Sequence, residues 1–445
     1  MSMEVEVKRY TSNRYIPEGW KKYKINELLV KTKKPVSVNN DETYREIGIR
    51  SHGKGIFHKE SIVGKELGNK SVFWIEPDCF IVNIVFAWEM AVAKTTKNEL
   101  GFIASHRFPM YKPIESKLNI DFITHFFKSN RGKHLLKMAS PGGAGRNKTL
   151  GQKEFAEIEV TIPDSIDEQR TIANILSTWD KTIELKEKLI ELKKDQNKGL
   201  MQKLLTGQIR WNDREKYTEE EIQQRLELID RGEVPDGYKK TRIGIIPVEW
   251  NTVYLKEKFD RSTKKNTMHN KNVLTISAQH GLVNQEDYFK KSVASENVEN
   301  YYLLLKGDFA YNKSYSKGYP YGAIKKLKAY NEGVVSPLYI CFTPNKNNKC
   351  PEYYEYYFEA GNFNREIHAI AQEGARNHGL LNVPVNDFFN LSIIDLDINE
   401  MKIISNIINA SFFEIELLEK ELEEIRNQKR GLMQQLLTGK VRVKV

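Results

Sequence analysis

The sequence predicts an α+β protein made of two mixed α/β domains, each followed by a long helix. The segment NKGLMQKLLTGQIR at 197–210 returns as KRGLMQQLLTGKVR at 429–442, a shift of 232 positions (431 − 199) between equivalent glycines. A chain of 445 residues is also too long for one ordinary core. Because so long a period is not typical of a solenoid, these observations indicate one module used twice.

The two domains are expected over residues 1–163 and 243–395, because the regions ahead of the repeated helices are also parallel. The scaffold signals agree between the halves, whereas the residues between them differ. The matching segments are IPEGWKKYKI (16–25) with IPVEWNTVYL (246–255), DCFIVN (78–83) with GDFAYN (307–312), ASHRFPMYKP (104–113) with VSPLYICFTP (335–344), and AGRNKTL (144–150) with GARNHGL (374–380).

The first long helix is expected within 164–208 and the second, with a tail, within 396–445. S-x-x-E at 165–168 and D-x-x-E at 397–400 are both capping-box starts, in which a side-chain oxygen accepts from a free amide and the carboxylate favours the helix N-terminus. Thr-Gly at 206–207 and at 438–439 predicts the same left-handed glycine stop in each copy.

Between cap and stop, apolar residues recur at alternating spacings of three and four, which predicts a coiled-coil seam. The seam residues are Ile172, Leu176, Trp179, Ile183, Ile190, Leu200 and Leu204 in the first helix, and Ile404, Ile408, Ile415, Leu418, Leu422, Ile425, Leu432 and Leu436 in the second. Lys186, Lys193 and Asn197 interrupt the first stripe. We therefore expect a weaker first seam, with each helix the natural partner of the other.

Gly199 and Gly431 lie inside these helices, where glycine costs about 1 kcal/mol relative to alanine. A close backbone crossing at these glycines, including one with a partner helix, would account for that cost. The segment 209–242 between the two halves is charged and poor in large apolar residues, so it is expected to be a linker with one short helix.

Composition favours a polyanionic partner. Lys and Arg number 69 against 59 Asp and Glu, which gives a net charge of +10. The three cysteines contain no Cys-x-x-Cys pair, so neither a disulfide framework nor a structural metal is expected. The N-terminus has no signal-peptide pattern, and the run CFIVNIVFAW is about half as long as a membrane span needs. These features predict a soluble, cytoplasmic protein.

Catalytic motifs are missing from the sequence. GGAGRNKT at 142–149 approaches a Walker A loop, but Asn147 stands where a glycine must let the backbone wrap a phosphate. Asp164 and the pair Glu184 and Lys186 match a nuclease pattern formally, yet they would lie about 30 Å apart along a helix. There is also no amino-methyltransferase loop, dinucleotide fingerprint or His-x-Glu zinc signature. The chain is expected to bind rather than to catalyse.

Turn-rich stretches that mix basic, amide and aromatic residues are the candidate DNA contacts. Such loops combine phosphate donors with flat side chains suited to base edges. The candidates are Arg50, His52, Lys54, Arg146, Asn147, Lys148, Gln279, His280, Lys313, Ser314, Tyr315, Lys317, Arg376, Asn377 and His378. Each is more often a solvated surface group, but their recurrence at matching places in both halves strengthens the set.

This organisation resembles the specificity (S) subunit of type I DNA restriction-modification systems. The most specific marks are DEQRTIANILSTWDKTIE, both GLMQ[KQ]LLTG ends, and GYKKTRIGIIPVEW before the second half. The resemblance implies two target recognition domains, each reading one half of a bipartite sequence, held apart by two long helices packed antiparallel. Helices packed in this way would relate the domains by a pseudo-two-fold axis, as in dimeric readers of half-sites.

The resemblance also implies partners: double-stranded DNA, two methyltransferase subunits docked on the helical region, and restriction subunits. S-adenosylmethionine, ATP and magnesium would belong to those partners, so no cofactor is expected on this chain. Two alternatives remain at this stage. One is a specificity subunit of another class of restriction enzyme, and the other is a coiled-coil scaffold that binds all duplexes alike with a steep salt dependence.

Overall fold

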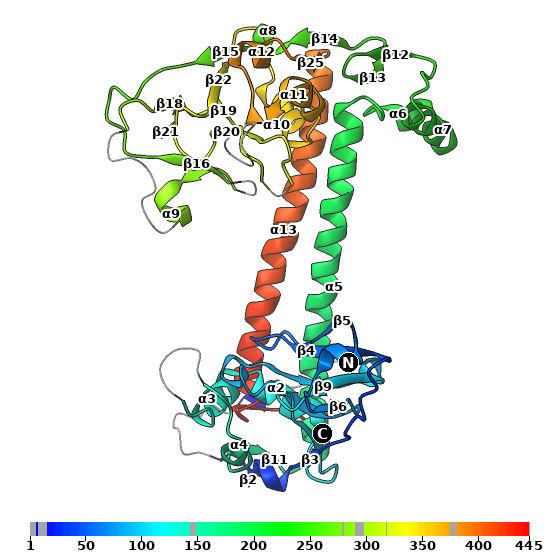
Figure 1. The fold of residues 1–445 in the computed structure, drawn as a ribbon, viewed down its shortest axis with the longest axis vertical. Helices are drawn as coiled ribbons and strands as arrows, with labels where there is room; N and C mark the ends of the chain where they lie inside the picture. The colour runs from blue at the N-terminus through cyan, green and yellow to red at the C-terminus, as the bar shows by residue number, and fades with distance from the viewer. Residues whose placement is uncertain are drawn as a thin grey trace. The chain divides into compact units, whose positions relative to one another are not determined.

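The computed structural model describes residues 6–7, 16–142, 148–277, 280–289, 298–316, 318–373, 379 and 381–444. The chain divides into two compact units. Unit 1 consists of residues 1–189 and 418–445, and unit 2 consists of residues 190–417. The two long helices therefore each contribute one part to unit 1 and the other part to unit 2 (Figure 1).

The folded domain of unit 1 is built on two four-stranded sheets. One has the order β3-β10-β7-β8 and is antiparallel; the other has the order β5-β4-β9-β6, in which β4 and β9 run parallel. A separate antiparallel pair, β2 with β11, joins the two ends of the domain. The strands are β2 (Trp20–Lys24), β3 (Leu29–Thr32), β4 (Thr43–Ile49), β5 (Ile56–Val63), β6 (Val72–Trp74), β7 (Phe80–Val82), β8 (Val92–Lys94), β9 (Phe102–Ser105), β10 (Met110–Pro113) and β11 (Glu159–Pro163).

Short helices cover the core of unit 1. They are α1 (Gly64–Leu67), α2 (Ile120–Phe127), α3 (Asn130–Met138) and α4 (Gln152–Ala156). Asn119 and Ser129 cap α2 and α3 by accepting from backbone amides two or three residues into each helix. Phe80 of β7, Phe127 of α2 and Phe155 of α4 pack together with ring centroids 5.2 to 6.1 Å apart. The end of the chain enters this core, because Leu436, Leu437 and Val441 belong to the same cluster.

Unit 2 repeats part of this plan, with the pairs β16-β17 and β18-β21 in place of the second four-stranded sheet. Its four-stranded sheet β15-β22-β19-β20 has the same strand order as β3-β10-β7-β8, and β14 pairs with β25 as β2 pairs with β11. The strands are β14 (Asn251–Tyr254), β15 (Phe259–Ser262), β16 (Leu274–Ser277), β17 (Gly281–Asn284), β18 (Tyr302–Leu305), β19 (Phe309–Asn312), β20 (Ala323–Lys326), β21 (Glu332–Val335), β22 (Ile340–Pro344), β23 (Gln372–Glu373), β24 (Leu381–Asn382) and β25 (Ser392–Asp395). The duplication read from the sequence is thus present in the strand order.

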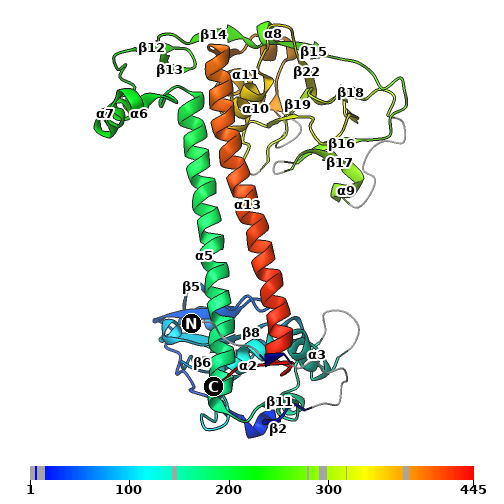
Figure 2. The same ribbon diagram turned by 180° about the vertical axis from the view of Figure 1, so that it is seen from behind.

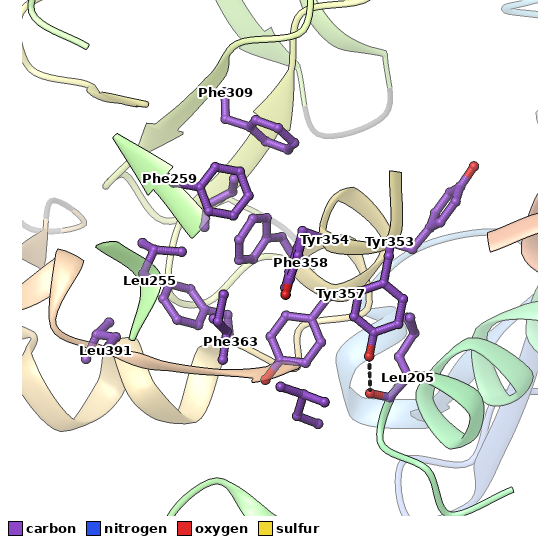
Figure 3. Packing of buried hydrophobic residues seen from close by; sticks show 14 of the residues in the cluster. Leu205, Leu255, Phe259, Phe309, Tyr353, Tyr354, Tyr357, Phe358, Phe363 and Leu391 are labelled. Carbon is purple, nitrogen blue, oxygen red and sulfur yellow. Dashed lines mark hydrogen bonds between the residues drawn. The ribbon is translucent and has the colours of Figure 1, made fainter. Parts of the chain in front are cut away.

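The core of unit 2 is aromatic (Figure 3). Its helices are α8 (Leu255–Lys258), α9 (Gln285–Phe289), α10 (Pro351–Glu359), α11 (Asn364–Ile370) and α12 (Val385–Phe389). Phe259 packs edge-on against Phe309, Phe342 and Tyr354, with centroids 5.2 to 5.5 Å apart. Tyr353 of α10 donates its hydroxyl to the Leu205 carbonyl at 3.4 Å, which ties the domain to the end of the first long helix.

The long helices are α5 (Ile166–Leu205) and α13 (Ile398–Leu436), and they pair antiparallel within each unit (Figure 2). In unit 1, Lys186 bonds Glu421 at 2.9 Å and Lys429 bonds Asp180, so the residue numbers rise on one helix as they fall on the other. In unit 2, Lys193 bonds Glu414 at 2.8 Å. The two seam lysines of α5 therefore reach glutamates of α13, which compensates for part of the weakness expected of the first seam.

The apolar seam residues are either buried or half-buried. Nine are buried: Ile172, Leu176, Ile190, Leu204, Ile404, Ile408, Ile415, Leu422 and Leu436. Trp179, Ile183, Leu200, Leu418, Ile425 and Leu432 are half-buried. Asn197 is buried, and its Oδ1 has no hydrogen-bond partner among the described residues.

The close crossing expected at the two helix glycines does not occur between α5 and α13. A Cβ built on Gly199 or on Gly431 would meet no described atom within 4 Å. Within the described part of the chain, neither glycine is required by packing against the other helix. An approach by a separate partner helix stays a prediction for these positions.

The linker is more ordered than expected. It holds α6 (Asp213–Lys216), α7 (Glu219–Asp230) and β12 (Tyr238–Thr241), which forms a hairpin with β13 (Gly244–Pro247) just beyond the linker. Arg225 forms an ion pair with the buried Asp213, and Tyr238 donates its hydroxyl to the Gly207 carbonyl at 2.8 Å. The prediction of one short helix was wrong because these contacts join residues distant in sequence.

None of the described helices is both long and apolar enough to cross a membrane. Cys79, Cys341 and Cys350 are free and buried. Burial raises the pKa of Cys79 to about 11 and that of Cys341 to about 12, so both thiols stay protonated at neutral pH.

Candidate nucleic-acid interface

The turn between β4 and β5 presents three of the sequence candidates to solvent. Arg50, His52 and Lys54 are all exposed there. His52 has a positive φ of 62°, and its amide donates to the Glu89 carbonyl at 2.6 Å. The amide of Gly53 donates to the Met90 carbonyl at 2.9 Å. These two bonds fix the turn against the loop at 83–90, so its side chains are presented from a defined backbone.

A third segment joins the same loop. The Leu150 amide donates to the Ile84 carbonyl at 2.8 Å, and the Lys148 ammonium lies 5.8 Å from the centre of the Trp88 ring. The structure thus brings Lys148 and the turn at 50–54 to one loop, although they are far apart in sequence. The sequence alone does not single out Trp88, because FAW at 86–88 stands at the end of an apolar run.

The matching loops of unit 2 are joined in the same way. The Leu381 amide donates to the Lys313 carbonyl at 3.0 Å, and the Tyr315 amide donates to the Gly379 carbonyl at 2.7 Å. In the alignment of the two halves Lys313 matches Ile84, and Leu381 lies one position beyond the match of Leu150, so the first of these bonds corresponds to the bond between Leu150 and Ile84 with a shift of one residue. Tyr315 is 63% exposed, which leaves its ring free to stack.

Two tyrosines of the same loop have structural partners instead. Tyr319 donates its hydroxyl to Glu359 at 2.5 Å and accepts from the Lys325 ammonium at 3.0 Å. Burial and the neighbouring Glu359 raise the pKa of Tyr319. The carbonyl of Tyr321 accepts from the Tyr311 hydroxyl at 2.8 Å. Of the sequence candidates described in this loop, Tyr315 is therefore the exposed one, and Lys313 and Ser314 are half-buried.

His280 lies in a different setting. It is exposed in the turn between β16 and β17, which is the counterpart of the turn between β4 and β5. It lines a cavity of about 360 Å³ together with Lys326, Lys328 and Asn409 of α13. Lys326 bonds Glu352 at 2.9 Å, so part of the positive charge at this cavity is already neutralised.

Seven candidates lie outside the described residues. They are Arg146, Asn147, Gln279, Lys317, Arg376, Asn377 and His378. Among the described candidates, cations and aromatic rings lie in the same loops, and together they supply both parts of a DNA contact, namely phosphate neutralisation and a flat surface for bases or sugars.

Comparison with known proteins also indicates DNA recognition. Residues 17–194 match the family described as type I restriction modification DNA specificity domain. The specificity subunit of the type I restriction enzyme MjaVIII from Methanocaldococcus jannaschii is 25% identical over 444 residues, which cover 96% of this chain and 94% of that protein. The putative MjaX specificity subunit of the same organism is 22% identical over 351 residues, covering 75% of this chain and 71% of that protein.

Solved structures share the fold. The HsdS subunit of Thermoanaerobacter tengcongensis aligns over 97% of this chain and 100% of its own, with a TM-score of 0.50 at 14% identity. The S subunit from M. genitalium aligns over 96% of this chain and 98% of its own, with a TM-score of 0.51 at 13% identity. A chain from a study of type I R-M complex assembly aligns over 95% of this chain and 98% of its own, with a TM-score of 0.55 at 12% identity. With the duplicated domains and paired helices, these findings show an HsdS-like protein, similar over nearly its whole length to the specificity subunits of type I restriction-modification systems.

Proposed function

We propose that this specificity subunit reads an asymmetric bipartite DNA sequence, one half with each recognition domain. The supporting observation is that the same backbone bond joins matching loops in both units, from Leu150 to Ile84 and from Leu381 to Lys313, while the side chains on those loops differ. Equal scaffolds would bring both domains to DNA in the same manner, and unequal side chains would read different bases.

The residues proposed to contact DNA fall into two sets. In unit 1 they are Arg50, His52, Lys54, Trp88 and Lys148; in unit 2 they are His280, Lys313, Ser314 and Tyr315. Lysines at these places would mainly bind phosphates, whereas Arg50 and His52 have the donors to read a base edge. The candidates outside the described residues belong to the same proposal.

The partners of such a subunit are DNA and the methyltransferase and restriction subunits of its system. We propose that two methyltransferase subunits dock on the helical region. Apolar side chains that leave the helix pair support this: Phe412, Phe413 and Leu417 of α13 are 41%, 58% and 49% exposed. Gly199 and Gly431, which have open space beside them, would let a partner helix approach closely. S-adenosylmethionine, ATP and magnesium would be bound by those partners, in the cytoplasm.

The proposed division of the chain is a first recognition domain at 1–163, a first spacer helix at 164–208, a linker at 209–242, a second recognition domain at 243–395, and a second spacer helix with its tail at 396–445. This division assigns target reading to the domains and spacing to the helices.

Single-molecule sequencing of DNA from cells that express the chain with its methyltransferase subunits tests the proposal. A motif of two unlike halves around a fixed gap, marked by N6-methyladenine, is the expected result. No methylation by an assembled complex, or methylation without a motif, would contradict it.

Loop variants assign the halves. Trp88→Ala with Arg50→Ala should weaken recognition in one half of the motif only, and Tyr315→Ala with Lys313→Ala in the other, each by roughly tenfold or more. Lys188→Ala, on the exposed side of α5, is the matched control and should change neither half.

A further inference from the structure

The carboxylate of Glu168, in the first turn of α5, is held by two residues from opposite ends of the sequence. The indole of Trp20 donates to Oε1 at 3.2 Å. The guanidinium of Arg442 donates from Nε to Oε1 at 2.7 Å and from Nη2 to Oε2 at 2.8 Å. Glu168 is 3% exposed and Trp20 is 5% exposed. Both carboxylate oxygens are thus engaged in a buried, bidentate ion pair.

Unit 2 contains the same arrangement. Its glutamate, Glu400, lies 232 positions after Glu168 (400 − 168), and its arginine, Arg210, lies 232 positions before Arg442 (442 − 210). Trp250 donates its indole N–H to Glu400 Oε2 at 3.1 Å. Arg210 donates from Nε to Oε1 at 2.6 Å and from Nη2 to Oε2 at 2.9 Å. We call each set of tryptophan, glutamate and arginine a triad.

Each triad joins three structural parts. The tryptophan begins the recognition domain, the glutamate begins the helix that leaves that domain, and the arginine follows the end of the other helix. The glycine three residues before each arginine supports the same junction. Gly439 (φ +68°) and Gly207 (φ +72°) lie so close to Pro17 and Pro247 that an added Cβ would be 2.4 and 2.5 Å from the proline ring.

A buried carboxylate held on both oxygens has one favourable orientation, because a guanidinium fork and an indole N–H fix its plane. The capping pattern read from the sequence explains only part of this. Ser165 accepts from the Glu168 amide at 3.3 Å, but the Glu168 carboxylate is bonded by Trp20 and Arg442. The glutamates are therefore built into a junction between domain and helix.

We propose that Arg442 and Arg210 are positioning residues, each of which fixes the angle at which one recognition domain leaves its helix and so sets the spacing at which that domain reads its half-site. This inference rests on the proposed bipartite recognition. Both arginines bond the glutamate that begins the helix leaving each domain. Their effect is on geometry, and the bases recognised should stay the same.

The test uses the complete complex of this chain with its methyltransferase subunits. The substrate is a set of duplexes in which the two half-sites are separated by the native gap or by one or two base pairs more or fewer. Methylation of each half-site adenine is measured separately. The variants are Arg442→Lys and Arg210→Lys, which keep the charge and lose the fork. Arg170→Lys, in an exposed pair with Asp167 near the start of α5, is the matched control.

We expect Arg442→Lys to lower methylation at the native gap at least tenfold in the half read by the first domain, and to raise the relative yield at shifted gaps. Arg210→Lys should do the same in the other half. If either complex fails to assemble, Trp20→Phe and Trp250→Phe, which remove the indole donor and leave a smaller aromatic ring, should broaden the gap preference in the same direction.

A gap profile that coincides with those of the wild type and Arg170→Lys would overturn the inference, even if the variant complexes were less stable. That outcome would leave the triads with a purely structural role. A wild-type complex that methylates without two unlike halves would instead contradict the proposed function, so the two failures are distinguishable.

Discussion

His125 of α2 is an ionisable side chain that the fold keeps neutral. Its Nε2 shares a hydrogen bond with Ser177 Oγ of α5 at 3.1 Å, and its Nδ1 lies 3.7 Å from Asp180. Burial lowers its pKa to about 4, against the opposing effect of Asp180. Because the unfolded chain binds this proton at a higher pH than the folded chain, protonation favours unfolding as the pH falls from about 6.5 towards 4.

We predict that His125→Gln makes unit 1 less sensitive to acid. Between pH 7 and pH 5 the wild type should lose about 2 kcal/mol more unfolding free energy than the variant, from the shift in pKa. Urea unfolding followed at both pH values measures this difference. His134→Gln, at an exposed position of α3, is the control and should behave as the wild type does. Equal pH dependence in His125→Gln and wild type would contradict the prediction.

At the scale of elements, the pair of α5 and α13 combines an apolar seam with charges that cross it. Lys186 and Lys193 occupy positions equivalent to Leu418 and Ile425, and each bonds a glutamate of the opposite helix. Such exposed pairs contribute at most about 1 kcal/mol, whereas apolar burial at a seam position contributes about 1.5 to 3 kcal/mol. The lysines therefore set register and partner choice more than stability.

We predict that Lys186→Leu with Lys193→Ile raises the thermal unfolding midpoint, because two apolar side chains would complete the seam while the released glutamates stay exposed. The gain should be on the order of 1 kcal/mol for each site. Calorimetry measures it, and the outward Lys188→Leu serves as control. A lower midpoint in the double variant would show that the ion pairs contribute more than burial.

We also predict that Gly199→Ala and Gly431→Ala each stabilise the isolated chain by about 1 kcal/mol, since both lie in helix interiors with open space beside them. If a methyltransferase helix approaches these positions closely, the same variants should weaken complex formation. Melting of the chain alone and titration with the methyltransferase subunit separate the two effects. Unchanged affinity in both variants would remove the glycines from the docking surface.

At the scale of the whole molecule, each unit is completed by the segment that follows one long helix. Arg442 follows the end of α13 and completes unit 1, and Arg210 follows the end of α5 and completes unit 2. Arg210 could therefore reach the Glu168 of a second copy, because Glu168 and Glu400 accept in the same way. We predict that a chain limited to residues 1–242 dimerises and directs methylation of a symmetric bipartite site. Sedimentation and sequencing of methylated DNA test this, and a monomer or an asymmetric motif would contradict it.

That dimer should be weaker than the natural pair of helices. In the same register, Lys186 would face Leu189 in place of Glu421, and Lys193 would face Thr182 in place of Glu414 (421 − 232 and 414 − 232). Restoring the seam by Lys186→Leu with Lys193→Ile should tighten the dimer, and equal dissociation constants would argue against this register.

A structural feature of this chain can be predicted from its sequence when the feature is local or repeated. The duplication, the two long helices and their seam could be predicted because cap, spacing and glycine stop recur in phase. The order within the linker could not, because the pair of Arg225 with Asp213 and the bond from Tyr238 to Gly207 are set by tertiary contacts. Glu168 was assigned to a cap because Ser165 lies three residues away, while Arg442 lies 274 residues away. Trp88 was missed because its role depends on which loops meet.

The division of unit 1 into two stretches of chain has a consequence for synthesis. Residues 1–189 leave the ribosome well before Leu436, Leu437, Val441 and Arg442, which complete their core and the first triad. Unit 2 is continuous from 190 to 417 and can close earlier. The first domain made is thus the last to be finished, and a nascent or prematurely terminated chain would expose an apolar face for chaperones and proteases to recognise. We expect a chain that lacks Val441–Arg442, which form the strand β26, to be degraded before it could act in a restriction-modification complex.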